Sequence, residues 1–144
     1  MGSRKSETAW YDAETKVQNQ LRYRGIASEH QSFASEYDLL TAGGQRVEVK
    51  YAGFRRLKKD GRMGWQINCH RHGVLDETNL DWYAAVLGSD PTNLFGKAVL
   101  TLIIPAPVEK FTLVISPRSL VSRWAGFVNN WGGLVEAEQA AYES

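Results

Sequence analysis

Apolar residues recur every three or four positions along the segment 7–24, which contains neither Pro nor Gly. The positions that carry this spacing are Trp10, Ala13 or Glu14, Val17 and Leu21. Such a period is typical of an α-helix with one face against a core. Gly25 follows directly and is the expected stop. The chain is therefore predicted to open with an amphipathic helix.

The pattern then changes to extended runs that are rich in apolar, aromatic and β-branched residues. Residues 35–41 and 46–52 are two such runs around the turn Ala42, Gly43, Gly44 and Gln45, which predicts a β-hairpin. Segments 80–87, 98–104 and 111–115 are further predicted strands. Segment 65–69 fits either a strand or the start of a short helix.

The remaining segments carry turn and helix signals. Residues 53–64 are basic, punctuated by glycine and free of apolar alternation, which predicts an exposed loop. Ser116 and Pro117 resemble a helix cap and first turn, and that helix is expected to reach about Asn129 and to end at Gly132 and Gly133. Residues 134–142 fit a short terminal helix or a loosely attached tail. The order predicts one α/β (α+β) domain over residues 1–144, with a mixed sheet of about four or five strands flanked by helices.

Composition indicates the kind of protein and its cellular compartment, but it does not indicate a function. The chain has 144 residues, of which 43% are hydrophobic and 23% charged, as expected for a globular domain. Its longest strongly apolar run, 98–104, is far shorter than the roughly 20 residues of a membrane span. The basic N-terminus lacks the apolar segment of a secretory signal. One cysteine, Cys69, cannot form an internal disulfide. We expect a cytoplasmic protein without a membrane partner.

Strand periodicity and hairpin pairing are expected to bring together two carboxylates and a lysine, Asp38, Glu48 and Lys50. Side chains alternate faces along a strand, so Glu48 and Lys50 share one face while Val47, Val49 and Tyr51 share the other. Antiparallel pairing in the hairpin can bring Asp38 beside Glu48. Two adjacent carboxylates repel each other unless a cation joins them, and Mg²⁺ binds to one or two carboxylates together with waters and substrate phosphates. With a nearby lysine, these groups suit phosphodiester hydrolysis.

Asp38, the ten-residue interval to Glu48 and the Glu48-Val49-Lys50 triplet resemble the PD-(D/E)xK nuclease superfamily, which has the restriction-endonuclease-like fold. Tyr37 stands where that pattern usually has Pro. Glu14, followed by Leu21 and Gly25, is similar to the N-terminal helix of the small resolvase-like branches.

The resemblance implies a role for each matched residue. Asp38 and Glu48 would bind Mg²⁺ or Mn²⁺, with the Val49 carbonyl and Glu14 as further ligands. Lys50 would assist the attacking water. Gln66 lies where some branches place an additional polar active-site residue. A surface position on the first helix remains nearly as good an interpretation of Glu14.

Basic residues concentrate between positions 55 and 62, although the formal net charge of the chain is only +1. The cations are Arg55, Arg56, Lys58, Lys59 and Arg62, set against the single acid Asp60. Arginine and lysine contact DNA phosphates without reading sequence, so this segment is a candidate DNA-binding surface. Arg71 is a further candidate. A solvated loop with no partner is an equally good interpretation.

The leading hypothesis is a magnesium-dependent DNA endonuclease that acts as a homo-oligomer, a dimer or a tetramer, because one small active site cuts one strand and symmetry supplies the second. A homing or other mobile-element endonuclease is favoured over a Holliday-junction-resolvase-like or repair nuclease. Two other hypotheses stay open: a noncatalytic nucleic-acid-binding module, and an interaction protein in which Glu48 and Lys50 are the solvated face of an edge strand.

Overall fold

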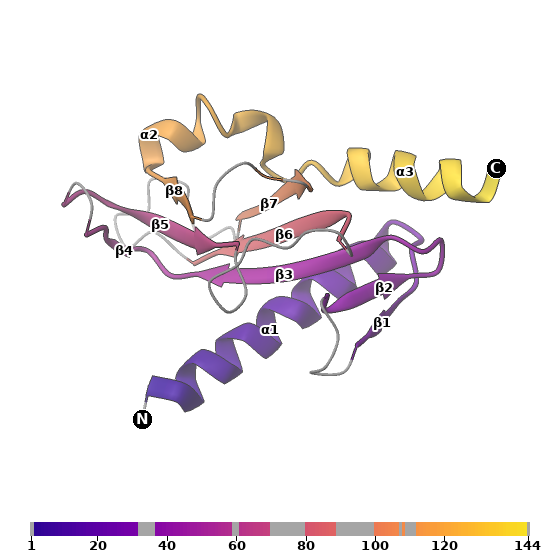
Figure 1. Cartoon of the computed structure of the whole chain (residues 1–144), viewed down its shortest axis with the longest axis horizontal. Helices are drawn as coiled ribbons and strands as arrows, with labels where there is room; N and C mark the ends of the chain where they lie inside the picture. Colours follow the sequence, from indigo (N-terminus) through magenta and orange to yellow (C-terminus); the bar gives the residue numbers. More distant parts are fainter. Residues whose placement is uncertain are drawn as a thin grey trace.

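The computed structural model describes residues 2–31, 37–58, 61–69, 80–88, 100–106, 108 and 112–143. The elements are shown in Figure 1. In chain order they are α1 (Gly2–Tyr23), β1 (Ser28–His30), β2 (Leu39–Thr41), β3 (Arg46–Ala52), β4 (Arg55–Arg56), β5 (Met63–Asn68), β6 (Trp82–Leu87), β7 (Leu100–Pro105), β8 (Thr112–Ile115), α2 (Pro117–Leu120), the 3₁₀ turn η1 (Ala125–Phe127) and α3 (Trp131–Glu143).

Two sheets are built from these strands. The larger sheet has the order β1-β2-β3-β6-β7, and the smaller one has the order β4-β5-β8. Strands β3 and β6 run parallel, whereas the other neighbours in the larger sheet run antiparallel. This arrangement confirms the predicted α+β class with a mixed sheet of five strands and flanking helices.

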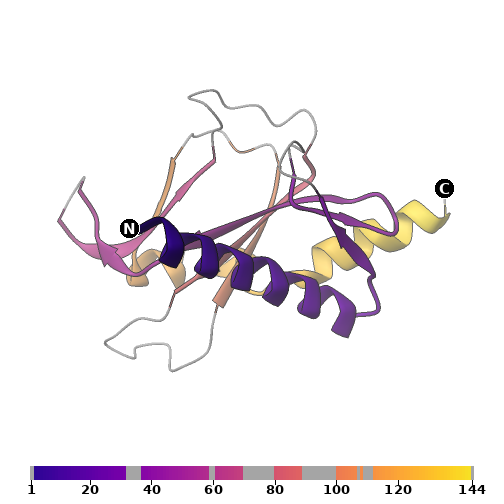
Figure 2. The same ribbon diagram turned by 90° about the horizontal axis from the view of Figure 1, so that it is seen from below.

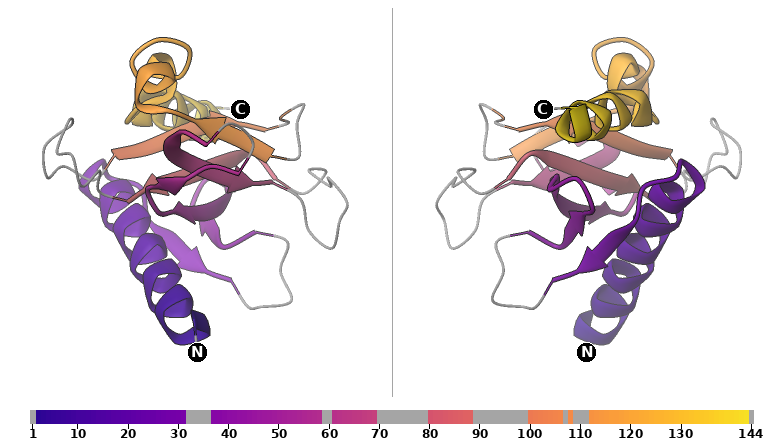
Figure 3. Two further views of the ribbon diagram at one scale, coloured as in Figure 1. Left: turned by 90° about the vertical axis from the view of Figure 1, so that its left-hand side faces the viewer. Right: turned by 90° about the vertical axis from the view of Figure 1, so that its right-hand side faces the viewer.

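The larger sheet is covered on both faces by apolar side chains. On one face, Ala13, Val17 and Leu21 of α1 pack with Val47 and Val49 of β3. Figure 2 shows α1 running across this side of the strands. The other face belongs to a second core whose larger members are Trp65, Tyr83, Leu102, Ile115 and Trp124. In Figure 3, α1 and α2 lie on opposite sides of the stacked strands. Trp131 and Leu134 of α3 belong to the same core as α1.

The expected exposed loop over 53–64 was wrong in part. Arg55 and Arg56 pair with Gly64 and Met63 of β5, and Leu57 is buried. A two-residue strand is too short for alternation to be visible in sequence, and its pairing partner lies across a turn. Segment 65–69 belongs mostly to strand β5.

The helix expected from Ser116 to about Asn129 was also wrong. Ser116 caps it as predicted, but α2 has one turn and ends at Leu120. Tertiary pairing keeps the chain from being helical as far as Asn129, because Val128 forms a bridge with Leu102 and the Asn129 N–H donates to the Thr101 carbonyl. The backbone groups of residues 128–129 that contact β7 are not available for the hydrogen bonds of a helix.

Gly132 and Gly133 do not end a helix. They lie in the first turn of α3, which then runs to Glu143 in place of a loose tail. A Cβ on Gly133 would lie 3.4 Å from the Trp82 ring, so a small residue suits this approach of α3 to β6. Within the described residues, no helix is long and apolar enough to cross a membrane.

Candidate active site

The carboxyl groups of Glu14 and Asp38 meet between α1 and the bend before β2. Burial raises the pKa of Glu14 from 4.5 to about 7, and the charge of Asp38 and a hydrogen bond to it act in the same direction. A like charge nearby disfavours the ionised form of a carboxyl group. Without a cation, the pair therefore holds a proton on Glu14 near neutral pH.

Asp38 is tied to β3 by its side chain as well as its backbone. Its Oδ2 accepts a hydrogen bond of 2.7 Å from the Val49 N–H, and its own N–H donates to the Val47 carbonyl over 3.0 Å. Leu39 pairs with Val47, so continuing this register by one residue brings Asp38 opposite Glu48. The carboxylate of Asp38 thus lies against the backbone between Glu48 and Lys50.

Glu48 and Lys50 occupy the face of β3 that points away from α1. Val47 and Val49 fill the core on the α1 side, whereas Ala52 belongs to the opposite core. Alternation along the strand then places Glu48 and Lys50 on the Ala52 side. Glu48 is only 7% exposed, and Lys50 is half-buried.

His30 adds a group that the sequence analysis missed. Gln18 Nε2 donates to the Ser28 carbonyl over 2.9 Å, so its Oε1 accepts a hydrogen bond of 2.8 Å from His30 Nε2. His30 Nδ1 then faces Glu14 Oε2 at 4.0 Å. Glu14 and Gln18 are four residues apart on a helix and so share a face. This spacing is the sequence signal that could have indicated Gln18 as a neighbour of Glu14.

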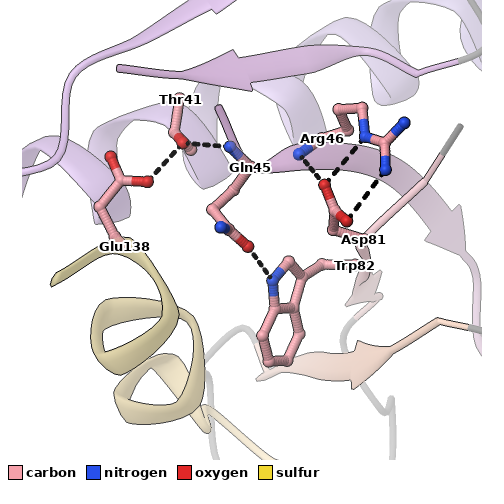
Figure 4. Close-up of polar contacts among 6 residues, drawn as sticks. All are labelled: Thr41, Gln45, Arg46, Asp81, Trp82 and Glu138. Carbon is pink, nitrogen blue, oxygen red and sulfur yellow. Dashed lines mark hydrogen bonds and ion pairs between the residues drawn. The ribbon is translucent and has the colours of Figure 1, made fainter. Parts of the chain in front are cut away.

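The turn of the β2–β3 hairpin is anchored to α3 by Glu138. This carboxylate is 4% exposed and accepts hydrogen bonds from Thr41 Oγ1 at 2.6 Å and the Gly43 N–H at 2.8 Å. Figure 4 shows the contact to Thr41, whose Oγ1 also accepts from the Gln45 N–H. A Cβ on Gly43 would meet Glu138 Oε1 at 2.5 Å, so any other residue there would displace this carboxylate from its contacts.

The same hairpin is anchored to the start of β6. The Arg46 N–H and guanidinium donate to the Asp81 carboxylate over 2.8 to 3.1 Å, and Trp82 Nε1 donates to Gln45 Oε1 over 2.8 Å (Figure 4). The Arg46 partner lowers the pKa of Asp81 below its usual value. Asp38 and Glu48 lie on the two arms of this hairpin. The contacts that hold the turn therefore also hold these two residues opposite each other.

The remaining candidate residues lie farther along the chain. Gln66, on β5, donates a hydrogen bond to Asn68 Oδ1 over 3.3 Å, and this contact does not connect it to Asp38 or Glu48. Arg55, Arg56, Lys58 and Arg62 are exposed on or beside β4 and β5. Lys59 and Arg71 lie outside the described residues.

The carboxyl pair suits a hard divalent cation. Asp38 lies close enough to Glu14 for its charge to raise the pKa of Glu14, and a cation between the two carboxylates would replace their repulsion by attraction. Across the described ranges, no group of three or more His, Cys, Asp or Glu side chains is arranged to hold a metal ion. Mg²⁺ requires fewer, since it uses one or two carboxylates and completes its shell with waters and phosphates.

Comparison with models of protein families and with curated proteins gave no match. Among solved structures, the chain is similar to a bacterial homing endonuclease, I-Ssp6803I. The TM-score is 0.70 at 15% sequence identity, and the similarity covers 96% of this chain and 98% of the endonuclease chain. The two proteins therefore share a fold over almost their whole lengths.

Proposed function

We propose that this chain is a metal-dependent DNA endonuclease with a PD-(D/E)xK active site. The observation that carries the proposal is the Glu14–Asp38 carboxyl pair, which is hydrogen-bonded to β3 between Glu48 and Lys50. Perturbed carboxyl groups of this kind cluster at functional sites. The shared fold with a protein named as a homing endonuclease supports the narrower proposal that this enzyme is a homing or other mobile-element endonuclease.

Asp38 and Glu14 would hold Mg²⁺ or Mn²⁺. Glu48 and the Val49 carbonyl are proposed as further ligands, although the described residues hold no three His, Cys, Asp or Glu side chains in one metal-binding group. When bound, such a cation polarises the phosphoryl group and lowers the pKa of a bound water. Lys50, adjacent on the face of Glu48, orients the attacking water and stabilises the negative charge that develops on the phosphate. The hydrogen bond from the Val49 N–H holds the carboxylate of Asp38 in position against β3.

Several groups outside these ligands hold the site in place. His30 and Gln18 lie behind Glu14, and groups behind a metal ligand usually fix its orientation. Glu138 and Asp81 hold the hairpin turn. A second copy of the chain would supply the second cut of a duplex, so the proposal includes a homo-oligomer.

The test is an assay of purified protein on supercoiled plasmid and on a long phage DNA, which together offer many sequences. We expect nicked or linear products with Mg²⁺ or Mn²⁺ and none with EDTA. Products that form equally in EDTA would contradict the metal role. DNA binding without any cutting on either substrate would favour a noncatalytic nucleic-acid-binding module.

A further inference from the structure

Strand β4 and the first residues of β5 form a short two-stranded ribbon, which we call the basic ribbon (Arg55–Arg56 paired with Met63–Gly64, and the residues between them that the structure describes). Arg55 pairs with Gly64 and Arg56 pairs with Met63. Its exposed cations are Arg55, Arg56, Lys58 and Arg62. None of the described residues of the basic ribbon is acidic. The described part of the ribbon is therefore basic, and Asp60 is the single acid in the segment between its two strands.

The basic ribbon is attached firmly to the core. Leu57 is 2% exposed and Trp65 is 1% exposed, and the Trp65 ring packs 4.9 Å from the ring of Phe54. Trp65 Nε1 donates to the Gly88 carbonyl over 2.9 Å. Within the ribbon, the Leu57 N–H donates to the Arg62 carbonyl over 2.7 Å. The cations thus stand on an ordered base.

We propose that the basic ribbon lies in the major groove of duplex DNA and contacts the phosphates on either side of it. This inference rests on the proposed endonuclease function and names its substrate as a duplex. The major groove, about 12 Å wide, admits a two-stranded ribbon, whereas the minor groove, about 6 Å wide, does not. Exposed arginine and lysine supply the phosphate contacts.

The position of the basic ribbon relative to the candidate site limits where it can bind. Figure 1 shows β3 leading from the hairpin directly to β4. Arg55 follows Lys50 by five residues, and five residues span at most about 18 Å. One strand of a duplex advances about 3.4 Å per nucleotide. The backbone of Arg55, where the ribbon begins, therefore lies within about five base pairs of the phosphate beside Lys50.

The test is the salt dependence of binding to a duplex of mixed sequence, measured by fluorescence anisotropy in EDTA so that no cutting occurs. Each phosphate contact contributes about 0.9 to the slope of log K against log salt concentration. We expect the double variant Arg55→Gln, Lys58→Gln to lose about 1.8 of that slope. The control is Arg22→Gln, an exposed cation in the last turn of α1, which should keep the wild-type slope.

Groove occupancy is tested separately by methylating guanine N7, a major-groove atom. We expect interference with binding at guanines within about five base pairs of the cut. An unchanged slope in the double variant, no interference from methylation of guanine N7, or tighter binding to single strands than to the duplex would each overturn the proposal.

The outcomes separate this inference from the function on which it rests. If the double variant loses slope and the wild type never cuts DNA with Mg²⁺, the endonuclease function fails while the ribbon assignment stands. If the wild type cuts and the double variant binds with the wild-type slope, the ribbon assignment fails while the function stands. Circular dichroism of the double variant checks that it remains folded.

Discussion

Glu14 and Asp38 come from separate elements of the chain, and their carboxyl groups lie close enough in the folded protein for the charge of Asp38 to raise the pKa of Glu14. Desolvation of Glu14 is the largest cause of its pKa of about 7, followed by the charge of Asp38. An ordinary surface glutamate on a helix would lose its proton far below neutral pH. The pair is therefore the part of the structure that distinguishes a candidate site from a solvated helix face.

The pair predicts a specific dependence of stability on pH in EDTA. The pKa of Glu14 is raised from 4.5 to about 7 on folding, so between these values the folded protein binds more protons than the unfolded chain. Its contribution to the free energy of unfolding is fully present below pH 4.5 and is lost as pH rises through 7, with a slope of at most about 1.4 kcal/mol per pH unit.

Glu14→Gln removes this titration, and its stability should change less over the same pH range. Urea denaturation at a series of pH values measures the difference. Glu136→Gln, at an exposed position on α3, serves as the control and should retain the wild-type slope. Equal slopes for Glu14→Gln and wild type would refute the coupling of Glu14 to folding.

Metal binding predicts a stabilisation that depends on Asp38. A ligand that binds only the folded state at about 100 times its Kd stabilises it by about 2.7 kcal/mol. We expect Mg²⁺ to raise the Tm of the wild-type protein and to have no such effect on Asp38→Asn, whose amide oxygen can still accept from the Val49 N–H. Asp12→Asn, on the exposed side of α1, is the matched control. A full Mg²⁺ effect in Asp38→Asn would remove Asp38 from the ligand set.

The Glu138 contact predicts a large loss of stability from a residue far from the chemistry. Glu138→Ala leaves the Thr41 hydroxyl and the Gly43 N–H without their acceptor, and an unsatisfied buried group costs roughly 1–3 kcal/mol. Denaturant unfolding should show a decrease of that size or larger. Glu136→Ala, on the exposed side of the same helix, should change stability by less than about 0.5 kcal/mol. Equal stabilities of the two variants would mean that the hairpin does not depend on Glu138.

Local periodicity predicted the parts of the site that depend on single elements. The period of two in β3 separated Glu48 and Lys50 from the valines, and the glycine turn predicted the hairpin that brings Asp38 opposite Glu48. The helical period of α1 correctly predicted its buried face.

Contacts between distant elements could not be predicted in this way. Glu138 meets Gly43 only because α3 packs against the hairpin, and nothing in the pattern of 131–143 indicates that one glutamate is buried. His30 lies near Glu14 only because β1 packs beside α1 in the folded protein. The helix predicted over 116–129 failed for a related reason, since Val128 and Asn129 form contacts with β7 that outweigh local propensity.

The most direct test of the central claim is the single-turnover rate of DNA cleavage by Lys50→Ala, with Lys16→Ala, an exposed lysine on α1, as the matched control. Loss of one group that stabilises transition-state charge typically lowers the rate by about 10² to 10³-fold. We predict a decrease of that size for Lys50→Ala with binding to duplex DNA retained, and a wild-type rate for Lys16→Ala. Cleavage by Lys50→Ala at the wild-type rate would show that the chemistry lies elsewhere in the protein.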